Sequence, residues 1–140
     1  MSVRKNIAEA KRWLRTAAQD LRAARILNRE GEYALSCFHA HQCAEKALKA
    51  LWYACDHSPR GHSLIKLIRE IAPFEKELYQ LLEDLLDEAA VLDKYYIPTR
   101  YPNGLPDLTP DEVYTRREAE KTLEIAEEFF ARAENFLKSL

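Results

Sequence analysis

The sequence has little glycine and lacks the short motifs that mark several common enzyme classes. Only three glycines, Gly31, Gly61 and Gly104, occur in 140 residues, and each separates two stretches of helical periodicity. No HExxH, P-loop, GxGxxG or GxSxG motif is present, so nothing supports a zinc protease, a P-loop nucleotidase, a dinucleotide-binding enzyme or a serine hydrolase. We therefore expect no cofactor. We also expect no metal, because His57 and His62 in one loop lack a carboxylate or thiol at a metal-binding spacing.

Cysteine is rare as well, long apolar runs are absent, and the net charge is small. The sequence has three cysteines, Cys37, Cys43 and Cys55, all in stretches with helical periodicity, and no CxxC motif. An odd number of cysteines in this arrangement favours reduced thiols and a cytoplasmic location over a disulfide framework. No apolar run approaches the roughly 20 residues of a membrane span, so we expect no membrane association. The formal net charge of −2 gives no overall attraction to nucleic acid, so any such attraction must be local.

What the sequence does contain is long helical periodicity. Apolar residues recur at spacings of three and four, as in amphipathic helices. The expected helices are 3–28, 32–55, 63–71, 74–92 and 109–137. Long helices with short joints predict an all-α, antiparallel up-and-down bundle of four main helices plus a short helix, with a crossover loop rich in proline and tyrosine. The length fits a single domain over residues 1–140.

The second expected helix carries polar side chains beside its apolar face. At about 100° per residue, His41 falls on the apolar arc, and Gln42, Glu45 and Lys49 share the adjacent stripe. Four hydrogen-bonding side chains on one helix edge could hold a polar ligand. The alternative is that Glu45 only satisfies His41 or pairs with Lys49, as helix side chains four residues apart often do. His39 faces away from this edge, and we expect it to be solvated.

The segment 93–104 places three tyrosines around one arginine between prolines. The prolines restrict the backbone, and stacked rings would hold the guanidinium of Arg100, which can then bind a phosphate or a carboxylate bidentately. Arg100 is therefore the best single ligand candidate. The alternative is that Tyr95, Tyr96 and Tyr101 pin a crossover loop to the bundle while Arg100 caps carbonyls at a helix end.

The first expected helix is locally basic. Its cationic side chains fall within an arc of about 80° on a helical wheel, a stripe that could follow phosphates: Arg4, Lys11, Arg15, Arg22, Arg25 and Arg29. The last expected helix is rich in glutamate and could neutralise this stripe directly or across a dimer. We expect a symmetric homodimer, because Trp13, Trp52 and seven tyrosines give more apolar surface than one small bundle covers.

Three short stretches together resemble the HEPN family (higher eukaryotes and prokaryotes nucleotide-binding domain). Residues 42–51, QCAEKALKAL, resemble the family's AEKALKAL helix; residues 61–64, GHSL, resemble its glycine–histidine loop; and residues 96–102, YIPTRYP, resemble its tyrosine-to-RYP element. With the flanking helices, the resemblance covers nearly the whole chain. It implies an α-helical up-down bundle, frequent dimerisation and, in many prokaryotes, a partner minimal nucleotidyltransferase in a two-component or toxin–antitoxin arrangement.

One departure from the family bears on catalysis. Ribonuclease members carry an arginine followed after four to six residues by a histidine, and no such pair occurs here. We therefore favour a nucleotide-binding and interaction module over an enzyme, with RNA a less favoured ligand. The alternative is a metal-independent ribonuclease of the HEPN type, with His41 or His62 acting with Arg100 at a site formed across the dimer interface. The expected ligand-binding residues are Arg100, Lys49, Glu45, Gln42, His41, Tyr96, Tyr101 and His62.

Overall fold

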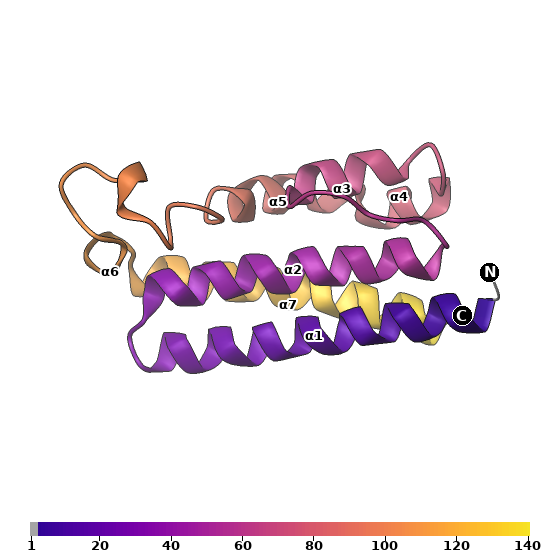
Figure 1. Ribbon diagram of the computed structural model, residues 1–140, viewed down its shortest axis with the longest axis horizontal. Helices are drawn as coiled ribbons and strands as arrows, with labels where there is room; N and C mark the ends of the chain where they lie inside the picture. Colours follow the sequence, from indigo (N-terminus) through magenta and orange to yellow (C-terminus); the bar gives the residue numbers. More distant parts are fainter. Residues whose placement is uncertain (1–2) are drawn as a thin grey trace.

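Three long helices lie side by side and form the body of the molecule (Figure 1). The computed structural model describes the backbone of residues 3–140 and the side chains of residues 6–140. α1 (Val3–Arg29), α2 (Tyr33–Ala54) and α7 (Arg116–Lys138) run along its long axis. Gly31 adopts a φ of 82° between α1 and α2, a conformation that glycine tolerates and that ends a helix. The regular structure of the described residues is entirely helical, so the expected all-α bundle is confirmed.

A second layer of shorter helices covers another side of α2 (Figure 1). It consists of α3 (Leu64–Ile71), α4 (Lys76–Leu82), the 3₁₀ turn η1 (Glu83–Leu85) and α5 (Leu86–Asp93). α3 and α5 contact each other, and both contact α2. α2 therefore lies between this layer and the α1–α7 pair. It meets its neighbours closely because its buried face is rich in small side chains: Ala40, Ala44, Ala47 and Ala50.

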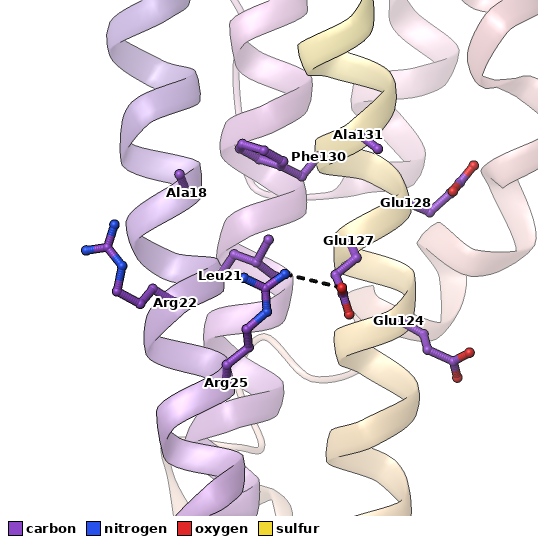
Figure 2. A pocket seen from close by; sticks show the side chains of 9 residues that line it. All are labelled: Ala18, Leu21, Arg22, Arg25, Glu124, Glu127, Glu128, Phe130 and Ala131. Atoms are coloured by element: carbon purple, nitrogen blue, oxygen red, sulfur yellow. Dashed lines mark hydrogen bonds and ion pairs between the residues drawn. The ribbon is translucent and has the colours of Figure 1, made fainter.

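α1 and α7 are linked at the surface by an ion pair (Figure 2). Nη2 of Arg25 lies 3.2 Å from Oε2 of Glu127. Both side chains are about half exposed, so the pair contributes no more than about 1 kcal/mol. It nevertheless means that a glutamate of the last helix neutralises part of the basic stripe directly. The side chain of Arg4, which the sequence assigns to the same stripe, lies outside the described residues.

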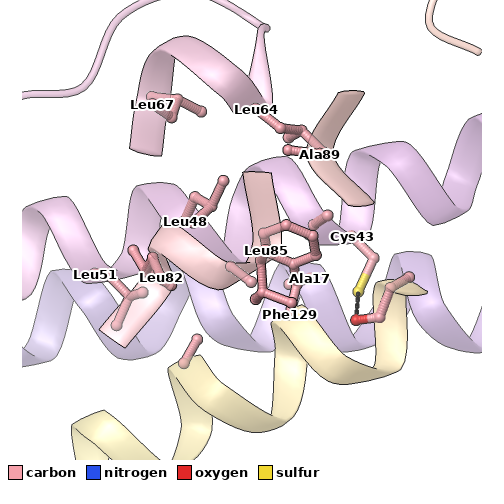
Figure 3. Close-up of a cluster of buried hydrophobic side chains, with 14 of the residues drawn as sticks. Ala17, Cys43, Leu48, Leu51, Leu64, Leu67, Leu82, Leu85, Ala89 and Phe129 are labelled. Carbon is pink, nitrogen blue, oxygen red and sulfur yellow. Dashed lines mark hydrogen bonds between the residues drawn. The ribbon is translucent and has the colours of Figure 1, made fainter. Parts of the chain in front are cut away.

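The hydrophobic core lies between α2 and the helices on either side of it (Figure 3). Leu48 and Leu51 of α2, Leu64 and Leu67 of α3 and Phe129 of α7 are each at most 2% exposed. Burying one such side chain stabilises the fold by about 1.5–3 kcal/mol. This packing fixes α3 against α2, which matters because the polar side chains described below come from these two helices and their flanking loops.

The expected helix 74–92 is interrupted. α4 ends at Leu82, and the turn of η1 joins it to α5. Nη1 of Arg132, from α7, donates to the carbonyl oxygen of Leu81 at 2.9 Å, and the same guanidinium pairs with Asp84. Because this carbonyl would otherwise accept from an amide one turn later, the arginine favours a break at this point. Its hydrogen bond also lowers the pKa of Asp84 below the ordinary value.

The expected helix 109–137 is also two helices. α6 (Pro110–Val113) is a single turn, and α7 starts at Arg116 after two extended residues. The hydroxyl of Thr115 accepts from the amide of Glu118 at 3.2 Å, and Oε1 of Glu118 accepts from the amide of Thr115 at 3.1 Å. This reciprocal capping box starts a helix. None of the helices in residues 3–140 is both long enough and apolar enough to cross a membrane.

Candidate functional site

A stripe along α2 faces the α3–α5 layer and the linker that follows α5. Phe38, His41, Glu45 and Lys49 succeed one another at spacings of three and four residues, so they lie on one side of the helix. His41 and Glu45 are buried, with 0% and 3% of their surface exposed. Buried polar groups need hydrogen-bond partners, and here most of the partners come from other segments.

His41 is paired with Asp93, the last residue of α5. Nε2 of His41 lies 3.1 Å from Oδ1 of Asp93 and donates to it, because an ionised carboxylate only accepts. Nδ1 of His41 lies 3.4 Å from the side-chain nitrogen Nε2 of Gln42 and 3.9 Å from Oε1 of Glu45. Asp93, rather than Glu45, is therefore the main partner of the buried imidazole.

Asp93 also caps α3. Its carboxylate accepts from the hydroxyl of Ser63 at 2.9 Å and from the amides of Leu64 and Ile65 at 2.8 and 3.2 Å. These amides lie in the first turn of α3 and have no acceptor within that helix. Burial would raise the pKa of Asp93, but the hydrogen bonds from His41, the two amides and Ser63 hold it below the ordinary value. One carboxylate therefore joins α5, α3 and α2.

Glu45 holds a second histidine. Its carboxylate lies 3.0 Å from Nζ of Lys49 and 3.2 Å from Nδ1 of His62, so the predicted pairing of Glu45 with Lys49 is confirmed. His62 comes from the loop before α3, and 57% of its side chain is exposed, against 4% for Glu45. Because Nδ1 is engaged with the buried carboxylate, Nε2 is the ring nitrogen left for a ligand.

The ring of Tyr96 lies against both histidines. Its centroid is 4.9 Å from that of His62, with the two rings within 19° of parallel, and 5.2 Å from that of His41. Tyr96 belongs to the linker between α5 and α6. Stacking of this kind adds about 0.5–1.5 kcal/mol to the burial of the rings, so the linker is held against the polar stripe of α2.

The guanidinium of Arg100 is surrounded by aromatic rings. Its carbon lies 4.4 Å from the centroid of Phe38, 4.8 Å from that of Tyr96 and 5.1 Å from that of Tyr101. Its Nε donates to the carbonyl oxygen of Tyr96 at 3.1 Å. Arg100 therefore binds a backbone carbonyl, which agrees with the alternative in which Arg100 caps carbonyls and binds no ligand. Within residues 6–140, however, no carboxylate lies at ion-pair distance from this guanidinium. Its positive charge is not neutralised by that part of the protein.

The structure arranges the predicted ligand residues in two adjoining groups. Tyr96 contacts members of both. Lys49 lies about 16 Å along α2 from Phe38, since eleven residues at 1.5 Å each separate them. Because Arg100 contacts Phe38, Lys49 and Arg100 do not share one small cleft. The first group is Arg100, Tyr96 and Tyr101 with Phe38, and the second is His41, Glu45, His62 and Lys49, with Gln42 at its edge.

Phe38, in the first group, and Asp93, which contacts His41 of the second group, were not predicted from the sequence. Phe38 precedes His41 by three residues on the same stripe, so its position on α2 is apparent, whereas its contact with Arg100 depends on the path of the linker. Asp93 stands at the junction of a helix and a linker. Its partners are 28 to 52 residues away in the sequence, and no local pattern marks them.

His39, which we expected to be solvated, is only partly so: 31% of its side chain is exposed. Its Nδ1 lies 2.9 Å from Oδ1 of Asp20 in α1, and Oδ2 of the same carboxylate lies 2.6 Å from Nζ of Lys46. Burial would raise the pKa of Asp20, but the hydrogen bonds from His39 and Lys46 lower it. A wheel drawn for one helix gives the direction of a side chain but not the neighbour that covers it, which here is α1.

Thiol and metal chemistry find no support in the geometry. The Cys43 thiol is buried and lies 4.0 Å from the carbonyl oxygen of Ala126 (Figure 3). Burial raises the pKa of this thiol to about 12, and a neutral thiol is a poor nucleophile. In the part of the chain that the structure describes, no three histidine, cysteine, aspartate or glutamate side chains are grouped so as to hold a metal ion.

Comparison with known proteins gives consistent matches over most of the chain. The HEPN domain family matches residues 10–136. A Methanocaldococcus jannaschii protein whose name describes it as a candidate toxin is 30% identical over 138 residues, which cover 95% of this chain and 91% of that protein. A crystal structure from Thermus thermophilus is 42% identical, with a TM-score of 0.83 over 90% of this chain and 96% of that chain. A HEPN domain protein from Thermotoga maritima is 28% identical, with a TM-score of 0.71 over 92% of this chain and 99% of that chain. The chain therefore belongs to the HEPN domain family.

Proposed function

We propose that the chain is the HEPN component of a two-component pair of the toxin–antitoxin type, and that it binds a nucleotide phosphate at Arg100. The observation that carries the binding proposal is the guanidinium held among three rings without a neighbouring carboxylate in the described residues. The pair proposal draws on the M. jannaschii relative, 91% of which is covered by the match. We further propose a single domain over residues 1–140, a homodimeric state and a cytoplasmic location.

Arg100 suits a phosphate because its side chain is already ordered. Its Nε is held by the Tyr96 carbonyl at 3.1 Å, and its guanidinium carbon lies over the rings of Phe38 and Tyr96. Less rotational entropy is then lost when a ligand binds. A planar guanidinium can donate two parallel hydrogen bonds to a phosphate, and no ion pair with a described carboxylate has to break first.

Tyr101 and His62 extend the site from a phosphate to a nucleotide. Tyr101 is 50% exposed beside the guanidinium, so one face can take a stacked base. The side chain of His62 is 57% exposed and its Nδ1 is held by Glu45, so Nε2 is the ring nitrogen available to a ligand. Arg100 and His62 both lie against Tyr96, so their separation cannot exceed the sum of the two distances, 4.8 and 4.9 Å, that join them to that ring. A mononucleotide can span such a gap.

Isothermal titration calorimetry with AMP, ATP and adenosine tests the binding proposal. We expect the phosphorylated ligands to bind more tightly than adenosine. Arg100→Ala should weaken AMP binding at least tenfold, which is about 1.4 kcal/mol, without changing the helical content. The matched control is Arg69→Ala, which removes an exposed arginine on α3. Equal affinities in the two variants would contradict a role for Arg100.

Coexpression tests the proposed partner. The family resemblance implies a minimal nucleotidyltransferase, so a tagged form of this chain should copurify with the nucleotidyltransferase encoded beside it. Cell growth should fall when this chain is expressed alone and recover when both are expressed. A neighbouring gene of unrelated type, or a nucleotidyltransferase that neither binds nor restores growth, would argue against the pair.

A second candidate function, metal-independent RNA cleavage, is favoured by the Glu45–His62 pair. The Nδ1 of His62 is held by a buried carboxylate and its side chain is largely exposed, an arrangement that suits a general base acting through Nε2. Arg100, near the same tyrosine ring, would stabilise the charge that develops on the attacked phosphate. We place this function second because the arginine-to-histidine spacing of the ribonuclease relatives is absent from the sequence.

A further inference from the structure

A second histidine is held by a carboxylate in the same way as His62, but the proposed nucleotide site does not use it. Nδ1 of His39 lies 2.9 Å from Oδ1 of Asp20 in α1, and Oδ2 of the same carboxylate lies 2.6 Å from Nζ of Lys46. Because Nδ1 is engaged and 31% of the side chain is exposed, Nε2 is the ring nitrogen available to a ligand. We call Asp20, His39 and Lys46 the Asp20 cluster.

The Asp20 cluster lies next to Arg100. The ring of Phe38 contacts both, because its centroid is 4.4 Å from the guanidinium carbon of Arg100 and 5.2 Å from the centroid of the His39 ring. The guanidinium and the imidazole are therefore no farther apart than the sum of these two distances. Gln42 follows Phe38 by four residues and His39 by three, so it neighbours both on the surface of α2. A polar side chain thus continues the surface from the arginine to the cluster.

The ammonium of Lys46 is accessible to a ligand as well. Lys46 lines an open hollow of about 310 Å³ between α1 and α2, together with Trp13 and Thr16 of α1. Its side chain is 24% exposed. An ammonium has three N–H donors, and Asp20 accepts from one of them. Lys46 can therefore bind an anion without leaving Asp20.

We propose that the Asp20 cluster binds the terminal phosphate of a nucleoside 5′-diphosphate whose first phosphate lies at Arg100. The proposal rests on phosphate binding at Arg100 and names the class of nucleotide that the site takes. The two phosphates of such a ligand share one bridging oxygen. They can therefore contact a guanidinium and an imidazole that lie against the same phenylalanine ring.

The proton chemistry of His39 favours a terminal phosphate over the phosphodiester of a nucleic acid. The carboxylate of Asp20 only accepts, so Nδ1 of His39 carries a proton, and Nε2 of the neutral ring can only accept. A terminal phosphate has a second pKa of about 6, so near neutral pH its oxygen and Nε2 can share one proton. A phosphodiester has no such proton to share. When the imidazole holds the proton, His39 and Lys46 outweigh the single carboxylate, and the cluster is positively charged.

Isothermal titration calorimetry with AMP and ADP tests the proposal, because ADP adds only the second phosphate. The wild type should bind ADP at least tenfold more tightly than AMP. In His39→Asn, the amide nitrogen can still donate to Asp20 as Nδ1 does, but nothing replaces Nε2. The ADP dissociation constant of this variant should come to within about threefold of its AMP constant, and the AMP constant should stay within about twofold of the wild type.

Two further variants control for folding and for position. Lys46→Gln keeps a donor for Asp20 but removes the ammonium, so it should also reduce the preference for ADP, by at least about threefold. His57→Asn is the matched control, because His57 has a similarly exposed side chain, 29% against 31%, and pairs with Glu75 instead. It should leave both dissociation constants unchanged. Circular dichroism should show the same helical content in all variants.

A ligand with differently spaced phosphates tests the diphosphate itself. Adenosine 3′,5′-bisphosphate has two phosphates separated by the ribose, and it should bind the wild type within about threefold of AMP. A gain equal to that of ADP would overturn the assignment to a 5′-diphosphate.

The outcomes separate this proposal from the one on which it rests. Equal AMP and ADP constants in the wild type, or a preference for ADP that survives in both His39→Asn and Lys46→Gln, would overturn the Asp20 cluster as a phosphate site. Phosphate binding at Arg100 would then still stand. An Arg100→Ala variant that binds AMP like the wild type would instead overturn phosphate binding at Arg100, and with it the placement of the diphosphate.

Discussion

The guanidinium carbon of Arg100 lies 4.4 Å from the centre of the Phe38 ring, which attaches the linker after α5 to α2. One turn further along α2, Asp93 at the start of the same linker reaches His41 at 3.1 Å. The first attachment is a cation–π contact, and the second is a hydrogen bond from a buried histidine to a carboxylate. Because the two use different side chains, substitutions can weaken one and leave the other in place.

Asp93→Asn should destabilise the fold. The asparagine amide has one oxygen where the carboxylate has two, so it cannot accept from His41, Ser63 and the amides of Leu64 and Ile65 together. We expect the free energy of unfolding in urea to fall by about 2–3 kcal/mol, as for loss of hydrogen bonds to a charged group. Asp87→Asn, at an exposed position on the same helix, should change it by less than about 0.5 kcal/mol. Similar losses in both variants would contradict the capping role of Asp93.

The same carboxylate should make stability depend on pH in the acid range. The pKa of Asp93 in the folded protein is held below its ordinary value, so the unfolded chain takes up the proton first as the pH falls. The stabilisation is complete above the unfolded pKa of about 3.9 and is lost as the pH falls through the folded pKa. Between pH 6 and pH 3, the free energy of unfolding should therefore decline more steeply in the wild type than in Asp93→Asn. Asp20, whose pKa is also lowered, adds the same pH dependence of stability to both proteins. Parallel curves of unfolding free energy against pH for the two proteins would contradict the role of Asp93.

Tyr96 should support nucleotide binding through its ring. Tyr96→Ala removes the surface that His62 and Arg100 share, and we expect AMP affinity to fall by about 1–2 kcal/mol, the scale of lost stacking and cation–π contacts. Tyr96→Phe keeps the ring and should stay within about twofold of the wild type, well under 1 kcal/mol. Calorimetry distinguishes the two variants. If phenylalanine is as damaging as alanine, the hydroxyl rather than the ring is responsible.

Purified protein should not cleave single-stranded RNA. No arginine precedes a histidine at the spacing that ribonuclease relatives use, and Nε2 of His41 is occupied by Asp93. The informative assay compares the wild type with His41→Ala and His62→Ala on structured and unstructured RNA. Cleavage by the wild type that His62→Ala abolishes would assign His62 as the general base and make the ribonuclease function the better one.

The local parts of the site were predictable from the sequence, and the parts that cross between elements were not. Spacing along one helix places Glu45 beside Lys49, and the proline-bounded tyrosines mark Arg100 as a held cation. The role of Asp93 could not be predicted in this way, because its partners lie on α2 and at the start of α3. The pairing of His39 with Asp20 could not be predicted either, because Asp20 lies on another helix.

The same distinction applies to the fold. The five expected helices follow from periodicity, glycine and proline. The break before α5 depends on Arg132 reaching across from α7 to the Leu81 carbonyl, which no local pattern indicates. The start of α7 is different, because the capping box of Thr115 and Glu118 is a local sequence signal for a helix start. The helical periodicity continues across this point, so we expected one helix where there are two.

The most direct measurement of the central claim is the NMR signal of the Arg100 side chain during ligand titration. In protein labelled with ¹⁵N, the Nε–H resonance of Arg100, identified by its absence from Arg100→Lys, should shift progressively with AMP and hardly at all with adenosine. The Nε–H resonance of Arg69 should stay in place with both ligands. An Arg100 resonance that does not move at millimolar AMP, or that moves equally with adenosine, would contradict phosphate binding at this guanidinium.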